Sequence, residues 1–510
     1  MSRVIPRVKY LLEGKLLESA GATTFPITCP ATGAVIGATP QCTASELDAC
    51  AASSERAFAG WSRVPPQQRA RVNFKLVQMI RDRTEEVAAL ITREQGKTLA
   101  DARGDVFRGL EVAEYACGAP SAALGAVAPV VGPHMETVSH RLPIGVCAGI
   151  FAFNFPAMLP LWGFPLAAGL GNTYLLKPSE RVPGAGVALA AMAQEAGLPP
   201  GVLNVVHGGP DTVNFLCDAP PVAAVSFVGS NAGGEHVFHR ASKSGKRVQS
   251  NMGAKNHGVL LPDADMGAAV GALVGAAFGA AGQRCMALPV VVCVGSAAAA
   301  IPKLVAAAAR LRVGRGDDPA ADVGPLISAE AAARARRIVG DAVAGGARVL
   351  LDGRAPTPPP GCEKGFWMGP TILHLGSGAA ALNSPAYKEE IFAPVMCVME
   401  ADTMEEAMGI VNANPWGNGG AVFTTSGASA HAFVHGVNIG QVGVNVPIPV
   451  PLPVFSFTGN KRSFLGSANF FGAPRGRALF APLPPPPLLR YLTLIPQQHT
   501  SHNAPQVPAL

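Results

Sequence analysis

The sequence has 510 residues, which is too long for one compact core, so we expect two or three domains. Its residues are 49% apolar and 15% charged, which is typical of a folded globular protein rather than a disordered one. The 40 basic residues nearly balance the 34 acidic ones and are scattered without interleaved aromatic residues, which argues against nucleic-acid binding. Glycine, proline or charge interrupts every apolar run before the ~20 residues that a membrane-spanning helix needs, so no membrane segment is predicted.

Cysteine and histidine spacing does not indicate a metal site. None of the ten cysteines has C-x-x-C spacing, and their dispersal along a long chain is typical of a reducing compartment. His236 and His239 form the nearest pair of potential ligands, and we interpret them as surface histidines on a helix. Residues 1–9 are basic, but neither a secretory nor an organellar leader is predicted there.

The first part of the chain combines short strands with long helices. Short strands are predicted within residues 10–17 and 26–38, with turns at 13–14 and 32–33. Apolar residues at helical spacing predict helices at 45–61, with Ser45 as the cap, 67–95 and 101–117. Residues 119–141 then change to glycine, proline, valine and alanine, which predicts an extended excursion, a β-hairpin leaving the main domain.

From residue 143 strands and helices alternate, which predicts a doubly wound parallel sheet that binds ligands at the carboxyl ends of its strands. The expected strands are 145–153, 173–177, 203–207, 223–228 and 248–252, and the helices are 159–170, 184–195, 213–217 and 232–244. A second αβ run has expected helices at 264–281, 297–311, 326–345 and 404–412, and strands at 289–294, 348–351 and 440–446.

Prolines shape the end of the chain. Alternating prolines at 447–453 cannot join a central ladder and predict an extended loop near a surface or cleft. Residues 481–487 and 497–510 are typical of polyproline or disordered segments, with room for a residual strand at 488–495.

Cys285 is the candidate nucleophile. It follows a run of small residues and the tripeptide Gly-Gln-Arg. The thiolate is the reactive form, and both the Arg284 guanidinium and free backbone N–H groups would favour it. The alternative is one more buried thiol, the commonest fate of free cysteine.

Several expected strand ends carry polar groups that could assist this thiol. Asn154 could hold an oxyanion with its amide, or could merely cap a helix. Lys177 could bind ribose hydroxyls or phosphate and Glu180 a ribose, or both could lie in a solvated turn.

Two further segments indicate a nucleotide site. The glycine-rich turn after strand 223–228 could receive a pyrophosphate on helix N–H groups, or be a plain left-handed turn. Glu390 and Phe392 lie two residues apart on a strand-like run and would share one face, where they could hold a sugar and a planar ring. The alternative is an ordinary edge strand.

The order of these segments resembles the aldehyde dehydrogenase superfamily. The motifs are F-N-F-P at 153–156, L-K-P-S-E at 176–180, F-V-G-S-x-x-x-G at 227–234, G-Q-R-C at 282–285 and E-E-I-F at 389–392. Within it, the segments similar to the CoA-acylating methylmalonate-semialdehyde dehydrogenase family are 94–99, 104–109, 250–257 and 445–451. The resemblance implies an α/β fold with two doubly wound αβ domains, one NAD-binding and one catalytic, plus a small β oligomerisation excursion.

The resemblance also implies roles for residues. Cys285 would form a thiohemiacetal with the aldehyde, and Asn154 and the Cys285 backbone N–H would form the oxyanion hole. NAD would accept the hydride and leave a thioester on Cys285. The implied cofactor-binding residues are Phe153, Lys177, Glu180, Gly229, Ser230, Gly233, Glu390 and Phe392. A carboxylate at Glu180 would favour NAD over NADP, because a 2′-phosphate would meet a like charge.

Asn251 indicates how the acyl group leaves. Hydrolytic members of the superfamily keep a glutamate at this position, and a neutral amide cannot act as a base. Deacylation by coenzyme A therefore fits. The implied substrates are methylmalonate and malonate semialdehyde, whose carboxylate suits a guanidinium. Arg284 is the first candidate for binding it, or for lowering the pKa of Cys285, and Arg108 is the second, with an ion pair as the alternative.

The resemblance implies the following domains: 1–123 and 143–252 NAD-binding, 124–142 an oligomerisation hairpin, 253–445 catalytic, 446–472 a return to the core with a cleft loop, and 473–510 an atypical proline-rich tail. It also implies a homodimer or homotetramer and a mitochondrial matrix location, with the cytoplasm as the alternative. Two other functions remain open, namely a hydrolytic NAD-dependent dehydrogenase of another small aldehyde, and a catalytically silent scaffold.

Overall fold

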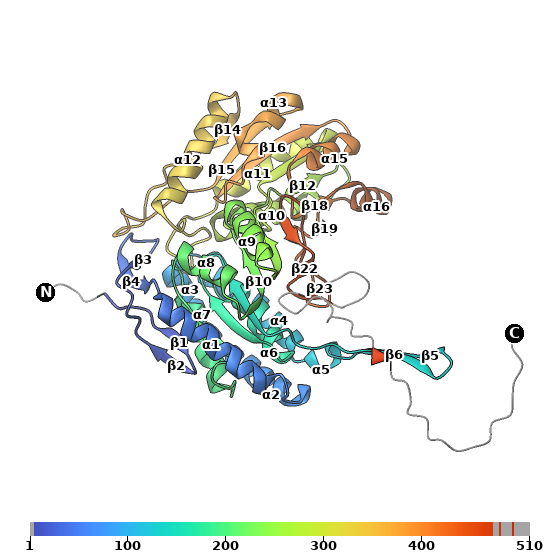
Figure 1. The fold of residues 1–510 in the computed structure, drawn as a ribbon. Helices are drawn as coiled ribbons and strands as arrows, with labels where there is room; N and C mark the ends of the chain where they lie inside the picture. Colours follow the sequence, from blue (N-terminus) through green and yellow to red (C-terminus); the bar gives the residue numbers. More distant parts are fainter. Residues whose placement is uncertain (1–4, 473–478, 481–491, 494–510) are drawn as a thin grey trace, which may run out of the picture.

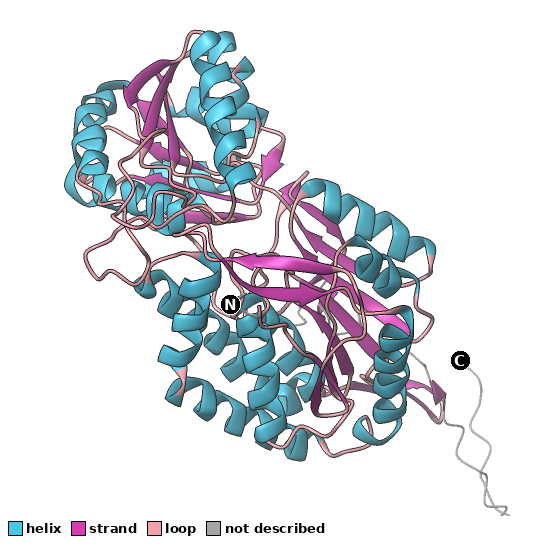
Figure 2. Cartoon of the chain, turned by 90° about the vertical axis from the view of Figure 1, so that its left-hand side faces the viewer, coloured by secondary structure: helices cyan, strands magenta, loops and turns pink. Residues whose placement is uncertain are grey.

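Two sheets, each with helices on both faces, organise the computed structural model, which describes residues 5–472, 479–480 and 492–493 (Figures 1 and 2). One lobe contains the first half of the chain and the other contains most of the second half. Over the described residues, no helix has the length and apolar character needed to cross a membrane. The fold class is thus α/β with two doubly wound domains, as predicted.

The first sheet has eight strands in the order β2-β1-β9-β8-β7-β10-β11-β21. Its strands are β1 (Tyr10–Leu12), β2 (Lys15–Leu17), β7 (Val146–Ile150), β8 (Thr173–Lys177), β9 (Leu203–Val205), β10 (Val222–Val228), β11 (Arg247–Asn251) and β21 (Phe464–Gly466). The five strands from β9 to β11 run parallel, whereas β1, β2 and β21 are antiparallel additions. Every residue of β7 and β8 is buried, as expected for strands covered on both faces.

The helices of this lobe are α1 (Ala44–Trp61), α2 (Pro66–Asp82), α3 (Thr84–Gln95), α4 (Leu99–Ala116), α6 (Met158–Gly169), α7 (Gly184–Glu195), α8 (Pro210–Asp218) and α9 (Asn231–Lys243). Two predictions were wrong in detail. The cap of α1 is Thr43, because its hydroxyl accepts the N–H of Glu46 while the Glu46 carboxylate accepts the N–H of Thr43. The expected helix 67–95 is divided at Arg83, where the Thr84 hydroxyl donates to the Ile80 carbonyl at 2.9 Å.

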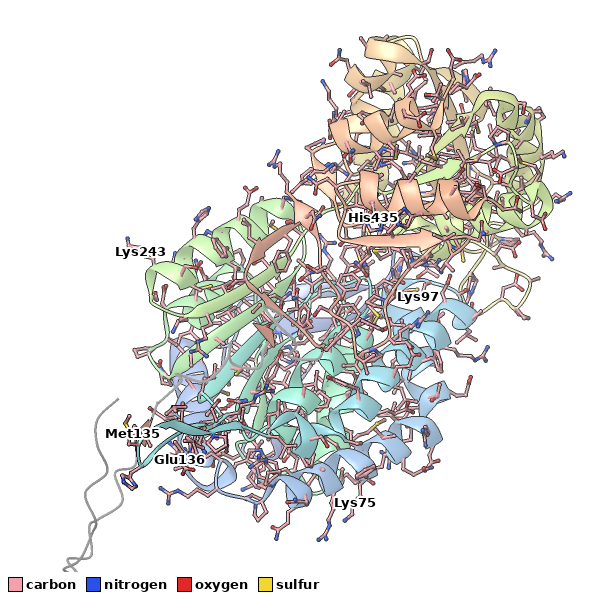
Figure 3. The ribbon with its side chains drawn as sticks, turned by 90° about the vertical axis from the view of Figure 1, so that its right-hand side faces the viewer. Lys75, Lys97, Met135, Glu136, Lys243 and His435 are labelled. Carbon is pink, nitrogen blue, oxygen red and sulfur yellow. The ribbon has the colours of Figure 1, made fainter. Side chains whose placement is uncertain are left out.

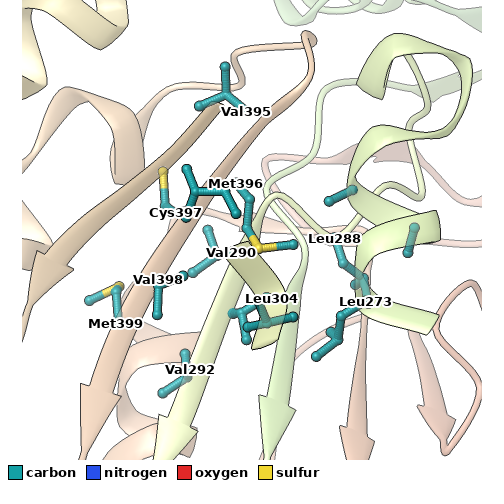
Figure 4. Packing of buried hydrophobic residues seen from close by; sticks show 14 of the residues in the cluster. Leu273, Leu288, Val290, Val292, Leu304, Val395, Met396, Cys397, Val398 and Met399 are labelled. Atoms are coloured by element: carbon teal, nitrogen blue, oxygen red, sulfur yellow. The ribbon is translucent and has the colours of Figure 1, made fainter. Parts of the chain in front are cut away.

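The second sheet has seven strands in the order β14-β15-β16-β13-β12-β18-β19. Its strands are β12 (His257–Leu260), β13 (Val290–Val294), β14 (Arg348–Leu351), β15 (Thr371–Gly376), β16 (Val395–Ala401), β18 (Gly419–Phe423) and β19 (Gln441–Val444). All neighbours are parallel except β14 and β15. Figure 4 shows valines of β13 packed against β16 in the centre of this core. Strands β12, β15, β16 and β18 were not predicted from the sequence.

Helices α10 (Met266–Phe278), α11 (Ile301–Ala309), α12 (Ala329–Ala344), α13 (Gly378–Asn383), α14 (Pro385–Lys388), α15 (Met404–Ala413) and α16 (Gly427–Gly436) surround the second sheet. The remaining short pairs are β3 (Thr24–Thr28) with β4 (Val35–Pro40), β17 (Trp416–Gly417) with β20 (Asn460–Lys461), and β22 (Ala468–Asn469) with β23 (Leu479–Phe480). The loop 447–453 contains no strand, in agreement with its prolines.

The predicted excursion is confirmed as a β-hairpin that projects from the first lobe (Figure 1). After α5 (Ala119–Ala122), β5 (Ala126–Gly132) pairs with β6 (Met135–Ser139), and Figure 3 labels Met135 and Glu136 on it. Strand β24 (Leu492–Thr493) pairs antiparallel with β6, within the segment predicted to hold a residual strand. The proline-rich runs 481–487 and 497–510 lie outside the described residues.

Candidate active site

Cys285 follows a backbone turn that the sequence did not predict. Helix α10 ends at Phe278 rather than at residue 281, and a 3-10 turn spans Gly279–Gly282. Ala280 and Ala281 have φ values of 49° and 54°, a left-handed conformation that costs about 1–2 kcal/mol per non-glycine residue. Two strained alanines therefore lie a few residues before the candidate nucleophile. Strain of this kind persists only where the surroundings impose it.

The Cys285 thiol is protonated at neutral pH. Burial, together with the nearby Glu390 carboxylate, raises its pKa to about 12, although the backbone N–H groups of Cys285 and Met286 act in the opposite direction. That Arg284 favours the thiolate stays a prediction. In this structure the Arg284 guanidinium bonds to the Asp101 carboxylate and to the Gly275 carbonyl.

Two asparagines that the sequence analysis assigned no role hold the nucleophile's peptide. The side-chain amides of Asn256 and Asn418 both donate to the Cys285 carbonyl at 2.9 Å. Asn256 also accepts the N–H of Gly419 at 2.9 Å, which ties the loop to β18. Asn256 lies in a glycine-rich segment after β11, which was the only available signal.

Asn154 lies just beyond the carboxyl end of β7, and its side chain faces the nucleophile loop. Its amide donates to the Gln283 carbonyl at 3.1 Å, and only 4% of the residue is exposed. The alternative that it caps a helix does not hold, because Ala157 occupies the N-cap of α6. Its role as an oxyanion donor remains a prediction.

A cavity of about 1420 Å³ runs between the lobes and reaches the thiol. Of the residues expected at the site, those that line it are Phe153, Asn154, Lys177, Glu180, Gly229, Ser230, Gly233, Cys285, Glu390 and Phe392. Arg108 and Arg284 are not among its lining residues. Arg108 instead pairs with Glu111 on α4 at 2.9 Å, which matches the ion-pair alternative. Substrate binding by either arginine stays a prediction.

The Glu390 segment differs from its expected form. Residues 389–394 form no strand, and Phe392 has a φ of 56°. The guanidinium of Arg334 on α12 donates to the carbonyls of Glu390 and Ile391 at 2.8 and 3.1 Å, so these carbonyls are not paired with a neighbouring strand. Glu390 and Phe392 nevertheless both reach the cavity, where the rings of Phe392 and Phe153 meet edge to face at 6.0 Å.

Glu390 is held over the backbone that follows β11. Its carboxylate accepts the N–H of Ala254 at 2.9 Å. A Cβ added to Gly253 would lie 2.8 Å from the Glu390 Oε2, so any larger residue there would have to displace this carboxylate. Burial raises the pKa of Glu390 to about 7, although the Ala254 N–H, Lys255 and Arg334 counteract it.

Lys177 and Glu180 also line the cavity. Lys177 is 3% exposed and lies 3.6 Å from the Glu180 carboxylate, which excludes the solvated turn for the lysine. Burial lowers the pKa of Lys177, and Glu180 opposes that shift. Thr39 of β4 donates to the Glu180 carbonyl at 2.7 Å, so the N-terminal hairpin positions this segment.

The glycine-rich turn after β10 opens α9 toward the cavity. Ser230 caps the helix by accepting the N–H of Gly233 at 3.3 Å. Gly229 does not have a positive φ, so the left-handed-turn alternative is wrong. A Cβ on Gly229 would come within 2.5 Å of the Phe227 ring, so glycine allows the backbone of the turn to lie close to that ring.

Asn251 ends β11, is 4% exposed, and accepts a hydrogen bond from the Gln249 side-chain amide through its own side-chain oxygen. A neutral amide at this position offers no general base. All ten cysteines lie in the described part of the chain, and none forms a disulfide. In that same part, no three His, Cys, Asp or Glu side chains come together as a potential metal site.

The fold and the cysteine cleft define a class of protein. The model of the aldehyde dehydrogenase family matches residues 16–473, so the chain belongs to that family. It also resembles one group within the family. A human relative is 53% identical over 92% of this chain and 87% of its own length, and is named methylmalonate-semialdehyde/malonate-semialdehyde dehydrogenase (acylating), mitochondrial. An Arabidopsis thaliana relative with a similar name is 52% identical over 92% of this chain and 76% of its own length.

Solved structures of similar proteins carry names from the same group of enzymes. The methylmalonate-semialdehyde dehydrogenase of Oceanimonas doudoroffii is 40% identical, with a TM-score of 0.89, covering 92% of this chain and 95% of that one. An NAD-complexed protein of Sinorhizobium meliloti 1021, provisionally assigned to the same enzyme, is 41% identical, with a TM-score of 0.90, covering 93% and 96%.

Proposed function

We propose that this protein oxidises methylmalonate semialdehyde, and malonate semialdehyde, with NAD and coenzyme A. The products are propionyl-CoA and acetyl-CoA, with release of CO₂, as in the catabolism of valine and thymine. The observation that carries the proposal is that the chain has both a thiol in the cleft, at Cys285, and an amide at Asn251 in place of a general base. Relatives named as acylating enzymes support it.

The residues present fit NAD. Glycine at positions 229 and 233 leaves room for a pyrophosphate at the start of α9, where a Cβ would meet Phe227. Lys177 and Glu180 would hold the adenosine ribose, and Glu390 the nicotinamide ribose. Phe153 and Phe392 would flank the ring. When bound, NAD supplies the hydride acceptor.

The chemistry of the chain's own residues follows from this arrangement. The Cys285 sulfur bonds to the aldehyde carbon, and its proton passes to solvent in the cavity that reaches the thiol. Donors at the Cys285 backbone N–H and the Asn154 amide would stabilise the resulting oxyanion. After the hydride leaves, the acyl group stays on sulfur as a thioester. The carboxylate of the acyl group then leaves as CO₂, and the carbon left by that C–C cleavage takes a proton from solvent, which gives the propionyl or acetyl thioester. Asn251 cannot activate water, so the coenzyme A thiolate takes the acyl group.

We also propose a division of the chain. Residues 1–123 and 143–252 would bind NAD, 253–445 would carry the catalytic thiol, and 446–472 would return to the core and the cleft. The hairpin 124–142 would serve a homodimer or homotetramer. The location would be the mitochondrial matrix, because the relatives' names say mitochondrial; the cytoplasm is the alternative.

NADH formation from methylmalonate semialdehyde, followed with and without coenzyme A, tests the proposal. We expect sustained turnover only with coenzyme A, and none in Cys285→Ala. Cys117→Ala is the matched control, because Cys117 is also half-buried but lies far along the chain on another element. Turnover indifferent to coenzyme A would support the hydrolytic alternative. No turnover from folded protein would support the scaffold.

A further inference from the structure

The strained turn before Cys285 is tied to the start of α4. The N–H of Ala280 donates to the Asp101 carboxylate at 2.9 Å. The other oxygen of that carboxylate takes the guanidinium of Arg284, the residue next to the nucleophile. The Asp101 side chain therefore contacts the nucleophile loop at two points, the first residue of the left-handed pair and Arg284, which follows that pair.

Asp101 is not needed to cap its own helix. Thr98 is the N-cap of α4, and its hydroxyl accepts the N–H of Asp101 at 3.1 Å. The Thr98 hydroxyl also donates to the Asp101 carboxylate at 3.2 Å, which fixes the direction of that carboxylate. Asp101 is 17% exposed and Arg284 19%, so this pair is far less solvated than an ordinary surface ion pair.

The same helix end holds the Asn154 loop. Lys97, immediately before α4, donates to the Asn154 carbonyl at 2.6 Å and pairs with Asp105 at 3.1 Å. Asp105 accepts the N–H of Met158 at 2.8 Å, so the two charges bracket the turn between β7 and α6. Both side chains are buried, at 1% and 0% exposure. Figure 3 shows Lys97 where the two lobes meet.

We propose that the start of α4 is a positioning element for the oxyanion site, with Asp101 setting the nucleophile loop and the Lys97–Asp105 pair setting Asn154. Neither Asp101 nor the Lys97–Asp105 pair touches the reacting atoms. Instead, one rigid helix end fixes both donor-bearing loops, which come from different lobes. The inference rests on the proposed function, because it concerns the same thiol and the same donor.

The test uses the full chain and the variant Asp101→Ala. Without the carboxylate the left-handed turn relaxes, and a displacement of the sulfur by about 1 Å is expected to lower kcat about a hundredfold. The KM for NAD should not change, because the cofactor residues lie elsewhere. The matched control is Arg103→Gln, which removes a solvent-facing pair with Glu85 from the same helix and should leave kcat unchanged.

Rescue separates positioning from general damage. Adding Ala280→Gly and Ala281→Gly to Asp101→Ala should restore much of the lost kcat, because glycine adopts a positive φ without strain. Asp101→Asn keeps an acceptor for Ala280 but loses the charge that holds Arg284, so its kcat should fall between parent and alanine variant. An Asp101→Ala enzyme with parental kcat would overturn the inference, as would a loss that the glycines leave unchanged.

Hydrogen–deuterium exchange tests the contact between Asp101 and the nucleophile loop without measuring turnover. Amides of the peptide 279–286 should exchange faster in Asp101→Ala than in the parent, while those of β7 remain as they are. Unchanged exchange at 279–286 would refute the proposal that Asp101 positions the nucleophile loop. If the parent fails to form NADH but the exchange responds as expected, the proposed function fails, whereas the positioning role of Asp101 is supported. The exchange measurement also decides the case if Asp101→Ala gives too little active protein.

Discussion

Replacing Lys97 with methionine removes the ammonium but leaves the Asp105 carboxylate in the interior. The two side chains are 1% and 0% exposed, so water cannot take over the lost contact. Methionine nearly preserves the volume of lysine, so the change tests charge rather than packing. The Asn154 carbonyl also loses its 2.6 Å donor, and the Phe155 ring loses a cation 4.3 Å from its centre.

The magnitude follows from the burial of the pair. Removing one partner of a buried ion pair typically costs about 3–5 kcal/mol, because the other charge is left uncompensated. For a domain of this size each kcal/mol lowers Tm by about 2–4 °C, so a fall on the order of 10 °C is expected. Adding Asp105→Asn removes the stranded charge and should recover a large part of that loss.

Thermal unfolding, monitored by circular dichroism, measures these differences, with Arg103→Met as the exposed control. Burial raises the pKa of Asp105, and Lys97 and the N–H groups of Met158 and Ala157 oppose it. In Lys97→Met that opposition weakens and the folded pKa rises further above the unfolded value. The deficit should therefore be largest at high pH and shrink as pH falls and the carboxyl takes a proton. An unchanged Tm, or a double variant worse than the single one, would refute the reasoning.

Three further outcomes are expected. Asn154→Ala should lower kcat about 10²–10³-fold, the usual cost of one oxyanion donor, with little change in the KM for NAD; an equal change in both would contradict the assigned role. Asn251→Glu should allow NADH formation without coenzyme A, because a general base contributes about 10²–10⁴-fold to the reaction of water. Glu390 has a pKa of about 7, so affinity for NAD should rise with pH through that value as the carboxylate forms. Isothermal titration should find this dependence lost in Glu390→Gln.

Local sequence patterns predicted those helices and strands whose ends depend on neighbouring residues. Strand β8, helix α7 and strand β14 begin and end at the predicted residues. Their apolar runs are bounded by glycine, proline or charge, so neighbours in sequence determine the ends. The strand exits at Asn154, Lys177 and Gly229 could be predicted for the same reason, because parallel strands present their carboxyl ends to one edge.

Long-range contacts decided what the sequence could not predict. Alanines favour helix, yet Ala280 and Ala281 are left-handed next to a carboxylate about 180 residues earlier in the chain. The alternating pattern around Glu390 predicts a strand, but Arg334 takes the carbonyls that a neighbouring strand would need. Nothing in the sequence indicated that Arg284 pairs with Asp101, which lies on α4. The residues next to a side chain in the sequence do not reveal which distant residue it contacts in the fold.

The burst of NADH in the absence of coenzyme A tests the central claim most directly. Rapid mixing of the enzyme with NAD and methylmalonate semialdehyde should give one NADH per active Cys285 and then stop, with the acyl group held on sulfur. Adding coenzyme A should restart NADH formation and release propionyl-CoA. Steady NADH production without coenzyme A would contradict the account, and so would an enzyme that forms no acyl adduct on Cys285 during the burst.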